Sequence, residues 1–285
     1  MKQLIVLLGV VGGSLSSVFV RYSTAPSLIL VLYRMAFSVL LLTPTAWRHR
    51  GEFAALPRRT LALCIASGVA LGAHFSTFFE AVKTTSIASA TVLVDMEVLF
   101  VALSTVLLFH RRLSGKAWAA ILLAFAGAVA VALADTTGGG GTLWGDALAV
   151  LSAMCIGVYT LIGSVCRRTV STPVYTYLVY GVAGATVLLL ALGSGTALFG
   201  YAAVNLWTAL GMAVCCTLLG HSIFSWGLKF LPPSFISTMR LLDCVFASLW
   251  GLLLFGERPG TMVLLGGAVV ILGVVLYSRT AADET

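Results

Sequence analysis

Hydrophobic residues along this chain occur in ten long runs that are separated by short polar segments. Each run holds about 18–25 mostly apolar residues, enough for an α-helix to cross the roughly 30 Å hydrocarbon core of a bilayer. The expected spans are residues 3–20, 27–46, 60–81, 85–109, 116–134, 144–163, 173–193, 204–228, 232–255 and 260–278. The pattern therefore predicts an all-α integral membrane protein with ten transmembrane helices.

The fourth span carries two acidic residues near its centre, Asp95 and Glu97. A carboxylate at the middle of a bilayer costs about 2.5–3.5 kcal/mol on insertion scales, so such residues normally face a cavity, a partner or a substrate pathway. The ninth span repeats the fourth at an offset of 146 residues, which places Asp243 on Glu97 and Phe246 on Phe100. The chain is therefore predicted to contain two copies of one unit.

Each unit would contain five spans, which is an odd number. The second copy must then enter the membrane in the opposite orientation, so the two copies must carry opposite loop charges. The basic loop 47–59 and its counterpart 194–204, which has no basic residue, fit this rule. We therefore predict a first five-helix unit in residues 1–134, a glycine-rich linker in 135–143 and a second five-helix unit in 144–285.

Composition agrees with this assignment, and the distribution of charge along the chain indicates orientation in the membrane. The chain is 60% hydrophobic and 9% charged, with a mean hydropathy of +1.05, whereas soluble domains are roughly 45–50% apolar and 25% charged. If the N-terminus is inside, twelve of the 17 Lys and Arg residues fall on the cytoplasmic side and three on the other. The positive-inside rule then predicts cytoplasmic termini, and the charge of +7 requires no nucleic-acid partner.

Enzyme and cofactor chemistry find no support in the sequence. The segments outside the spans are about a dozen residues long at most, too short for a soluble catalytic domain. The sequence has no zinc-ligand spacing and no nucleophile elbow. The glycine run 138–141 lacks the Lys and Ser/Thr of a phosphate-binding loop. We therefore expect no enzymatic activity, no cofactor and no metal site.

Candidate substrate-binding residues lie near the predicted midplane, where repeat-built transporters place their sites. Glu97 and Asp243 are each about twelve residues from either end of their spans, so they form the leading pair. Arg240 and Asp243 are three positions apart and can meet on one helix face, which would neutralise Asp243 and leave Glu97 available. Asp95 is about 200° from Glu97 around a helix, so both acids cannot face one cavity equally.

Three roles are open for Glu97. It could bind a cationic group of the substrate, or it could take up a proton that alternates with substrate, because burial favours the neutral form of a carboxyl group. It could instead be a structural partner of Arg34 or Arg240. For Arg34 itself, snorkelling to the lipid headgroups and pairing with an acid inside the bundle are equal alternatives.

Further candidates lie in the third and eighth spans. His74 and His221 are one position out of register between the two copies, and each could line the cavity or form a hydrogen bond between helices. Phe78, which matches Phe224, and Trp226 could add cation–π contacts to the site. Aromatic residues at helical spacing more often serve packing, so both interpretations are kept.

Four stretches resemble the drug/metabolite transporter superfamily, specifically its EamA-type ten-helix proteins. They are GHSIFSWGLKFLPPSFIS from Gly220, LLFGERPGTMVLLGGAVVILGVVLY from Leu253, GDALAVLSAMCIGVYTLIGSVCRR from Gly145 and AHFSTFFEAVKTTSIASATVLV from Ala73. The similarity covers nearly the whole chain in two copies. It implies an inverted repeat of five and five helices and a secondary transporter that works by alternating access. It also implies a central cavity lined by spans 1, 3, 4, 6, 8 and 9.

Two departures from the family pattern bear on function. Such proteins commonly have a proline in the middle of the fourth and ninth spans, where this chain has Val98 and Cys244. We therefore expect the kink to be lost. Because Asp95 and Glu97 look like additional acids, we favour a cationic or zwitterionic substrate over that of a generic amino-acid exporter.

Together these patterns predict a secondary active transporter of small polar metabolites, amino acids or organic amines, in a bacterial-type inner membrane. Export would be coupled to protons or to exchange. Multidrug efflux of organic cations is the alternative within transport, and a non-transporting or lipid-scrambling membrane protein is the alternative outside it. The expected partners are a small-molecule substrate and the lipid bilayer, with the protein acting as a monomer or a homodimer.

Overall fold

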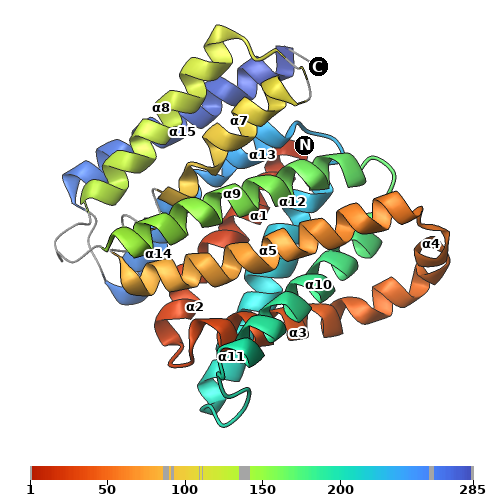
Figure 1. Ribbon diagram of the computed structural model, residues 1–285. Helices are drawn as coiled ribbons and strands as arrows, with labels where there is room; N and C mark the ends of the chain where they lie inside the picture. The colour runs from red at the N-terminus through yellow and green to blue at the C-terminus, as the bar shows by residue number, and fades with distance from the viewer. Residues whose placement is uncertain are drawn as a thin grey trace.

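A computed structural model describes residues 2–85, 90, 93–108, 110, 112–134, 142–256 and 260–283. Every regular element within these ranges is a helix, and the long helices pack side by side in one body (Figure 1). They are α1 (Lys2–Ser14), α2 (Ser16–Tyr22), α3 (Ser27–Arg48), α4 (Arg50–Ala55), α5 (Arg58–Thr84), α7 (Glu97–Leu107), α8 (Gly115–Ala134), α9 (Leu143–Cys166), α10 (Thr172–Gly193), α11 (Ala203–Gly211), the π-helix η1 (Met212–His221), α12 (Ser222–Gly227), α13 (Pro233–Arg240), α14 (Asp243–Phe255) and α15 (Thr261–Asp283). The predicted all-α class is confirmed.

The helices correspond closely to the predicted spans. Among the described residues, eight helical segments are long and apolar enough to cross a membrane, and α8 has a shorter apolar stretch, Gly115–Ala130. These segments match nine of the ten predicted spans. The remaining one, 85–109, runs over residues outside the described part, where α7 is its main described element. The chain is a multi-pass membrane protein.

Of two predicted connections, the structure describes one fully and the other only at its end. The basic loop 47–59 is largely helical, because the end of α3, α4 and the start of α5 occupy it. The predicted linker 135–143 lies outside the described residues except for its last two positions. The division of the chain into units at this linker therefore stays a prediction.

The fourth and ninth spans are interrupted at corresponding positions. A short helical stretch over 93–95 ends at Met96, and α7 then begins at Glu97. In the ninth span α13 ends before a turn, and α14 begins after Leu242 at Asp243. Met96 and Leu242 are 146 residues apart. Each acid of the leading pair is therefore the first residue of a half-helix, where the positive end of the helix dipole favours a carboxylate.

The break in the ninth span forms without proline. The amides of Leu241 and Leu242 donate to the carbonyls of Thr238 and Met239, three residues back, at 3.2 Å each. This is the tighter 3₁₀ pattern, which often marks a hinge when it occurs within a helix. The expectation that the kink is lost with the proline stays a prediction, because Leu241 and Leu242 keep right-handed helical backbone angles through this turn.

Two other spans also depart from one continuous α-helix. The first divides at Leu15 between α1 and α2, and the eighth contains η1, a π-helix of 10 residues. Within η1 the Thr217 hydroxyl donates to the Met212 carbonyl, five residues back, at 3.4 Å. π-Helical turns inside longer helices are frequent at functional sites. This one packs against α1 and α3.

Glycines bring α8 and α15 into close contact at one side of the molecule (Figure 1). A Cβ added to Gly127 on α8 would lie 2.7 Å from the Val270 amide nitrogen on α15. A Cβ added to Gly273 on α15 would lie 2.5 Å from the Ala124 nitrogen on α8. The two glycines are 146 residues apart, which is the offset of the predicted repeat.

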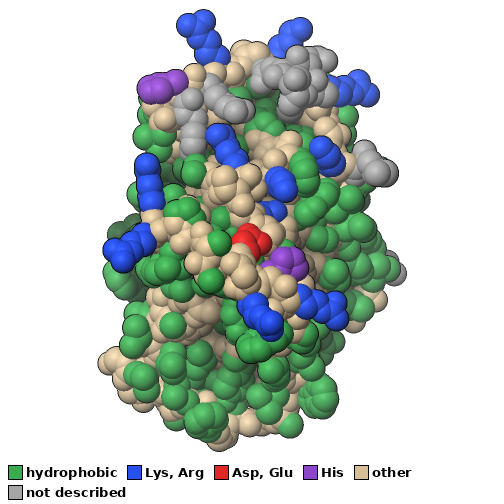
Figure 2. All heavy atoms as spheres, turned by 90° about the vertical axis from the view of Figure 1, so that its right-hand side faces the viewer, with side chains coloured by type: hydrophobic (Ala, Val, Ile, Leu, Met, Phe, Trp, Pro, Cys, Tyr) green, Lys and Arg blue, Asp and Glu red, His purple; other side chains and the backbone are tan. Residues whose placement is uncertain are grey.

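One end of the helical body is strongly basic. Figure 2, which faces the right-hand side of Figure 1, shows Lys and Arg spread over this end with very little Asp or Glu. Helix α4 and the marked chain ends lie toward this side in Figure 1. The distribution suits a cytoplasmic location of this end under the positive-inside rule, and the orientation itself stays a prediction.

Candidate functional site

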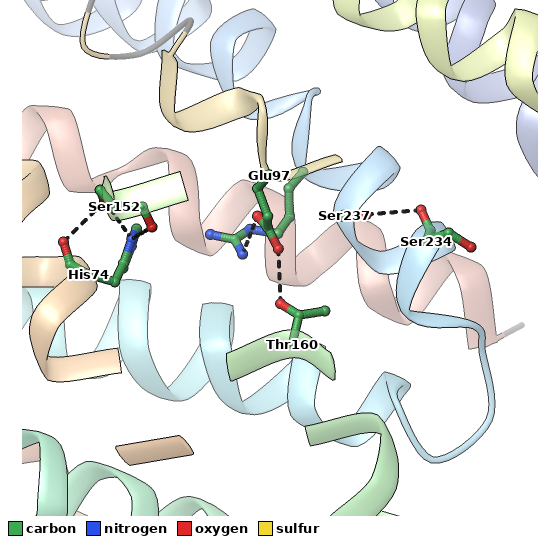
Figure 3. Close-up of polar contacts among 7 residues, drawn as sticks. His74, Glu97, Ser152, Thr160, Ser234 and Ser237 are labelled. Carbon is green, nitrogen blue, oxygen red and sulfur yellow. Dashed lines mark hydrogen bonds and ion pairs between the residues drawn. The ribbon is translucent and has the colours of Figure 1, made fainter. Parts of the chain in front are cut away.

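An ion pair joins the two broken spans inside the molecule. Glu97 Oε2 accepts from Arg240 Nη1 at 2.8 Å, and Glu97 Oε1 accepts from the Thr160 hydroxyl at 2.9 Å (Figure 3). Glu97 begins α7, Arg240 ends α13, and Thr160 lies on α9. Only 5% of the Glu97 side chain and 14% of the Arg240 side chain are exposed. A carboxylate buried this deeply needs a counter-charge, which Arg240 supplies.

This pairing differs from the expected one. The sequence predicts that Arg240 neutralises Asp243 on one helix face, but no ion pair joins the two among the described residues, although they lie within electrostatic range. Arg240 instead pairs with Glu97. In the part of the chain that the structure describes, Asp243 has no ion-pair partner, and its buried Oδ1 has no hydrogen-bond donor. Glu97 is thus the paired acid and Asp243 the available one, the reverse of the prediction.

Helix α1 forms the wall beside Asp243. A Cβ added to Gly13 would lie 3.6 and 3.7 Å from the two carboxylate oxygens of Asp243 and 4.0 Å from the Phe224 ring. The Trp250 indole of α14 donates to the Ser14 hydroxyl of α1 at 2.9 Å, which holds the two helices together. The small residue at position 13 therefore leaves the space next to the carboxylate open.

Asp95 belongs to the same group of charges. It is partly exposed, and it lies within electrostatic range of Asp243, Glu97 and Arg240. Met96 keeps right-handed helical backbone angles, φ −58° and ψ −13°, so the predicted offset of about 200° between Asp95 and Glu97 still applies. Three acids share one arginine here, so the local excess of negative charge favours a cationic ligand.

A row of rings leads from Arg240 to a second arginine. The Arg240 guanidinium lies 5.6 Å from the centre of the Phe224 ring, which is 6.3 Å from the ring of His221. His221 is in turn 5.2 Å from the Phe75 ring, and the Arg34 guanidinium lies 4.3 Å from that ring's centre. The row is built from α12, η1 and α5, so three elements must pack correctly to form it.

The two predicted histidines have different surroundings. His74 Nδ1 is hydrogen-bonded to the Ser152 hydroxyl at 2.8 Å, which joins α5 to α9 (Figure 3). Its ring stacks on Phe78 at 6.0 Å. His74 therefore makes the contact between helices that was one of its two predicted alternatives. The buried Nδ1 of His221 has no hydrogen-bond partner among the described residues, so His221 keeps unused hydrogen-bonding capacity.

Trp226 lies apart from this group. Its indole packs on the Phe230 ring at 5.0 Å, and the Lys2 ammonium group lies 4.4 Å from the centre of the same ring. These contacts tie the end of the eighth span to the start of α1. The structure thus brings together Asp95, Glu97, Arg240 and Asp243 and connects them by rings to His221, Phe78 and His74, whereas it places Trp226 elsewhere.

Sequence reasoning missed the residues of α1 and α9 that contact the acids. Thr160 donates to Glu97, and Gly13 lies against Asp243. The available signal was the repeat itself, because Thr160 lies 146 residues after Ser14, the neighbour of Gly13. The offset that relates the two acids also relates the helix positions beside them.

Arg34 has an environment that neither predicted alternative describes. Its side chain is buried on α3, and its Nε donates to the Thr217 hydroxyl of η1 at 2.7 Å. It does not reach the headgroups, because only 1% of it is exposed. Within the described ranges no carboxylate forms an ion pair with it.

Comparisons with known proteins agree with one another. The model of the EamA-like transporter family matches residues 1–133 and 143–279. An uncharacterized transporter of Archaeoglobus fulgidus is 26% identical over 277 residues, covering 96% of this chain and 95% of its own. The pseudopaline exporter CntI of Pseudomonas aeruginosa is 24% identical over 270 residues, covering 90% of this chain and 88% of its own. A crystal structure of another protein, 18% identical, matches with a TM-score of 0.81 over 99% of this chain and 98% of that chain.

Proposed function

Because the chain belongs to the EamA-like transporter family and is a membrane transporter, we propose that it carries small polar metabolites with an amine or similar cationic group. In this proposal the cationic group binds Asp243 and alternating access moves it across an inner membrane. The observation that carries the proposal is the buried Oδ1 of Asp243, which has no partner among the described residues.

The physical argument starts from the cost of an unpaired buried carboxylate. Leaving such a group without donors costs several kcal/mol, and a substrate ammonium would supply both charge and N–H donors. A hydrogen bond to a charged group contributes about 1.5–3 kcal/mol. The Phe224 ring near Gly13 and Asp243 offers a cation–π surface beside the carboxylate. Amino acids and organic amines fit this combination.

Glu97 and Arg240 have a positioning role in this proposal. Glu97 holds the Arg240 guanidinium through a 2.8 Å contact, and Thr160 fixes the other carboxylate oxygen. Arg240 therefore forms its ion pair with Glu97 and not with Asp243, although Asp243 is three positions away and within electrostatic range. Of the three roles left open for Glu97, the structural one has the most support.

Two matched breaks support the proposal of inverted repeats in residues 1–134 and 144–285. Each break precedes an acid, and the acids are equivalent positions of the two units. Half-helices that meet near the midplane are typical of transporters built from inverted repeats. Rocking one unit against the other around the fixed acids would expose Asp243 to each side in turn.

Coupling follows from competition at the same carboxylate. A proton and a cationic substrate cannot occupy Asp243 together, so the protein would exchange one for the other or exchange two substrates. Affinity for the substrate should then fall as the pH falls, because protonation removes the negative charge. Export is the favoured direction, since the similar Pseudomonas aeruginosa protein is described as an exporter.

The test uses purified protein in liposomes with radiolabelled amino acids, polyamines and quaternary amines in counterflow. We expect the Asp243→Asn variant to lose exchange of the accepted amine at least about tenfold, as expected for one charge-assisted hydrogen bond. The matched control is Asp146→Asn, because Asp146 lies at the start of α9 and accepts from Thr85 at 2.7 Å, away from the site. An Asp243→Asn variant that exchanges amines like the wild type would contradict the proposal.

The same assay separates the alternatives. Competition by hydrophobic cationic dyes with high affinity would favour multidrug efflux. Scrambling of labelled lipids, with no flux of any soluble compound, would favour the lipid-handling alternative. We expect neither outcome, because the acids are held by an ion pair and a hydrogen bond, which suit a small polar substrate better than a hydrophobic dye or a lipid.

A further inference from the structure

Arg34 is a buried cation that the proposed function does not use. Its side chain is 1% exposed. Its Nε donates to the Thr217 hydroxyl at 2.7 Å, and its guanidinium lies 4.3 Å from the centre of the Phe75 ring. The bond from Nε to Thr217 is the one hydrogen bond that the Arg34 side chain makes in the part of the chain that the structure describes. One neutral hydrogen bond and one ring face offset only part of the cost of burying a guanidinium.

Contacts around Arg34 fix the position of its Nε group and leave its Nη groups without hydrogen bonds to described residues. The Thr217 hydroxyl donates to Met212 and accepts from Arg34, so both of these contacts have defined directions. The Tyr180 hydroxyl donates to the Thr217 carbonyl at 3.4 Å, which further fixes this turn of η1. A guanidinium held in this way presents paired N–H groups in a plane, the geometry that matches a carboxylate.

Arg34 and Asp243 lie on opposite ends of one polar and aromatic region. His221, in the middle of the ring row, is within electrostatic range of both Arg34 and Arg240. Cys216 on η1 is within electrostatic range of both Arg34 and Asp243. The unpartnered His221 Nδ1 lies in the same region. Three groups without full hydrogen bonding therefore surround the row: the buried Arg34 guanidinium, the buried His221 imidazole and the Asp243 carboxylate, whose Oδ1 is buried.

We propose that Arg34 binds the carboxylate of a zwitterionic substrate whose amine binds Asp243. The assignment rests on the proposed function, because Asp243 supplies the cationic half of the site. Rings of Phe75, His221 and Phe224 lie between the two charged ends. The substrate class is therefore an elongated amino-carboxylate, with several bonds between amine and carboxylate, rather than a simple amine or a short α-amino acid.

Matched pairs of ligands test the assignment on the wild-type protein. Lysine and cadaverine, ornithine and putrescine, and arginine and agmatine differ by the presence of a carboxylate. Inhibition of counterflow in liposomes and thermal stabilisation in detergent give the affinity of each. We expect the carboxylated member of an accepted pair to bind about 10- to 100-fold more tightly, the range of one charge-assisted contact. Glycine, which is short, should bind weakly.

Variants then show which residue causes the preference for the carboxylated ligand. Arg34→Gln should abolish the difference within a pair while leaving the affinity for the amine unchanged, and Arg34→Lys should restore part of it. Asp243→Asn should weaken both members. Arg59→Gln is the control, because Arg59 is exposed at the start of α5. If Arg34→Gln fails to fold, the comparison of ligand pairs on the wild-type protein still tests whether the site binds a carboxylate.

The outcomes separate the two proposals. Amines that bind as tightly as their carboxylated partners would overturn the role of Arg34 and leave the proposed function standing. A pair preference that survives in a folded Arg34→Gln variant would also overturn it. Absence of binding by both members of every pair would overturn the proposed function and this assignment with it.

Discussion

Single side chains decide which acid of this transporter remains available. Arg240 is bound by Glu97 and Thr160 fixes the second oxygen of that carboxylate, so Asp243 is left with a buried oxygen that has no donor among the described residues. Sequence position alone suggests the opposite, because Arg240 and Asp243 are near neighbours in the chain. The distance between helices, rather than the distance along the chain, sets the partner.

Breaking this ion pair should cost stability in a way that a double variant reveals. Removing one partner of a buried pair leaves an uncompensated charge, which typically costs about 3–5 kcal/mol. We expect Glu97→Gln and Arg240→Gln each to lower the unfolding temperature in detergent, and the double variant to lose less than the sum of the two. Glu80→Gln, at an exposed position of α5, should be neutral. Additive losses would contradict the direct contact.

At the scale of helices, the interruptions in the fourth and ninth spans position the residues of the candidate site. Both acids begin half-helices, and the turns before them are 146 residues apart. The repeat in the sequence predicts matched positions for the two acids, Glu97 and Asp243. It could not reveal the breaks, because the usual signal, proline, is absent at Val98 and Cys244. The 3₁₀ hydrogen bonds of Leu241 and Leu242 involve residues that are otherwise ordinary in helices, so propensities do not reveal them.

Close packing of α8 on α15 should depend on glycine at position 273. A Cβ there would lie 2.5 Å from the backbone nitrogen of Ala124, a contact that neither helix can relieve by moving a side chain. We expect Gly273→Ala to destabilise the protein by about 1–3 kcal/mol, the usual cost of overpacking. Gly181→Ala on α10 is the matched control, because a Cβ there meets nothing within 4 Å. Equal unfolding temperatures for the two variants in detergent would contradict the prediction.

On the scale of the whole molecule, the number of spans could be predicted well and their internal shape could not. The length of an apolar run is set by the thickness of the bilayer, so the nine matched spans follow from composition alone. The π-helix of η1 and the division at Leu15 leave no mark in hydropathy. The basic end in Figure 2 agrees with the distribution of Lys and Arg in the sequence. The orientation of this end in the membrane can be tested by labelling single residues.

Surface labelling should confirm that the basic end faces the cytoplasm. Phe199, 80% exposed, follows α10, and Trp47, 66% exposed, lies at the end of α3 on the basic side. In intact cells we expect an impermeant maleimide to modify Phe199→Cys and to modify Trp47→Cys only after permeabilisation. The parent chain reports the background from its six native cysteines. The reverse labelling pattern would mean that the predicted orientation is wrong.

The contact between Glu97 and Arg240 also bears on how such a chain can evolve. Its two members come from different predicted units, and the position 146 residues before Arg240 is Val94. An assembly made from two copies of residues 1–134 would contain Glu97 twice and the arginine not at all. Each carboxylate would then be buried without a counter-charge. The two predicted units would therefore not be interchangeable, and a change at Glu97 in one would be acceptable only with a matching change at Arg240 in the other.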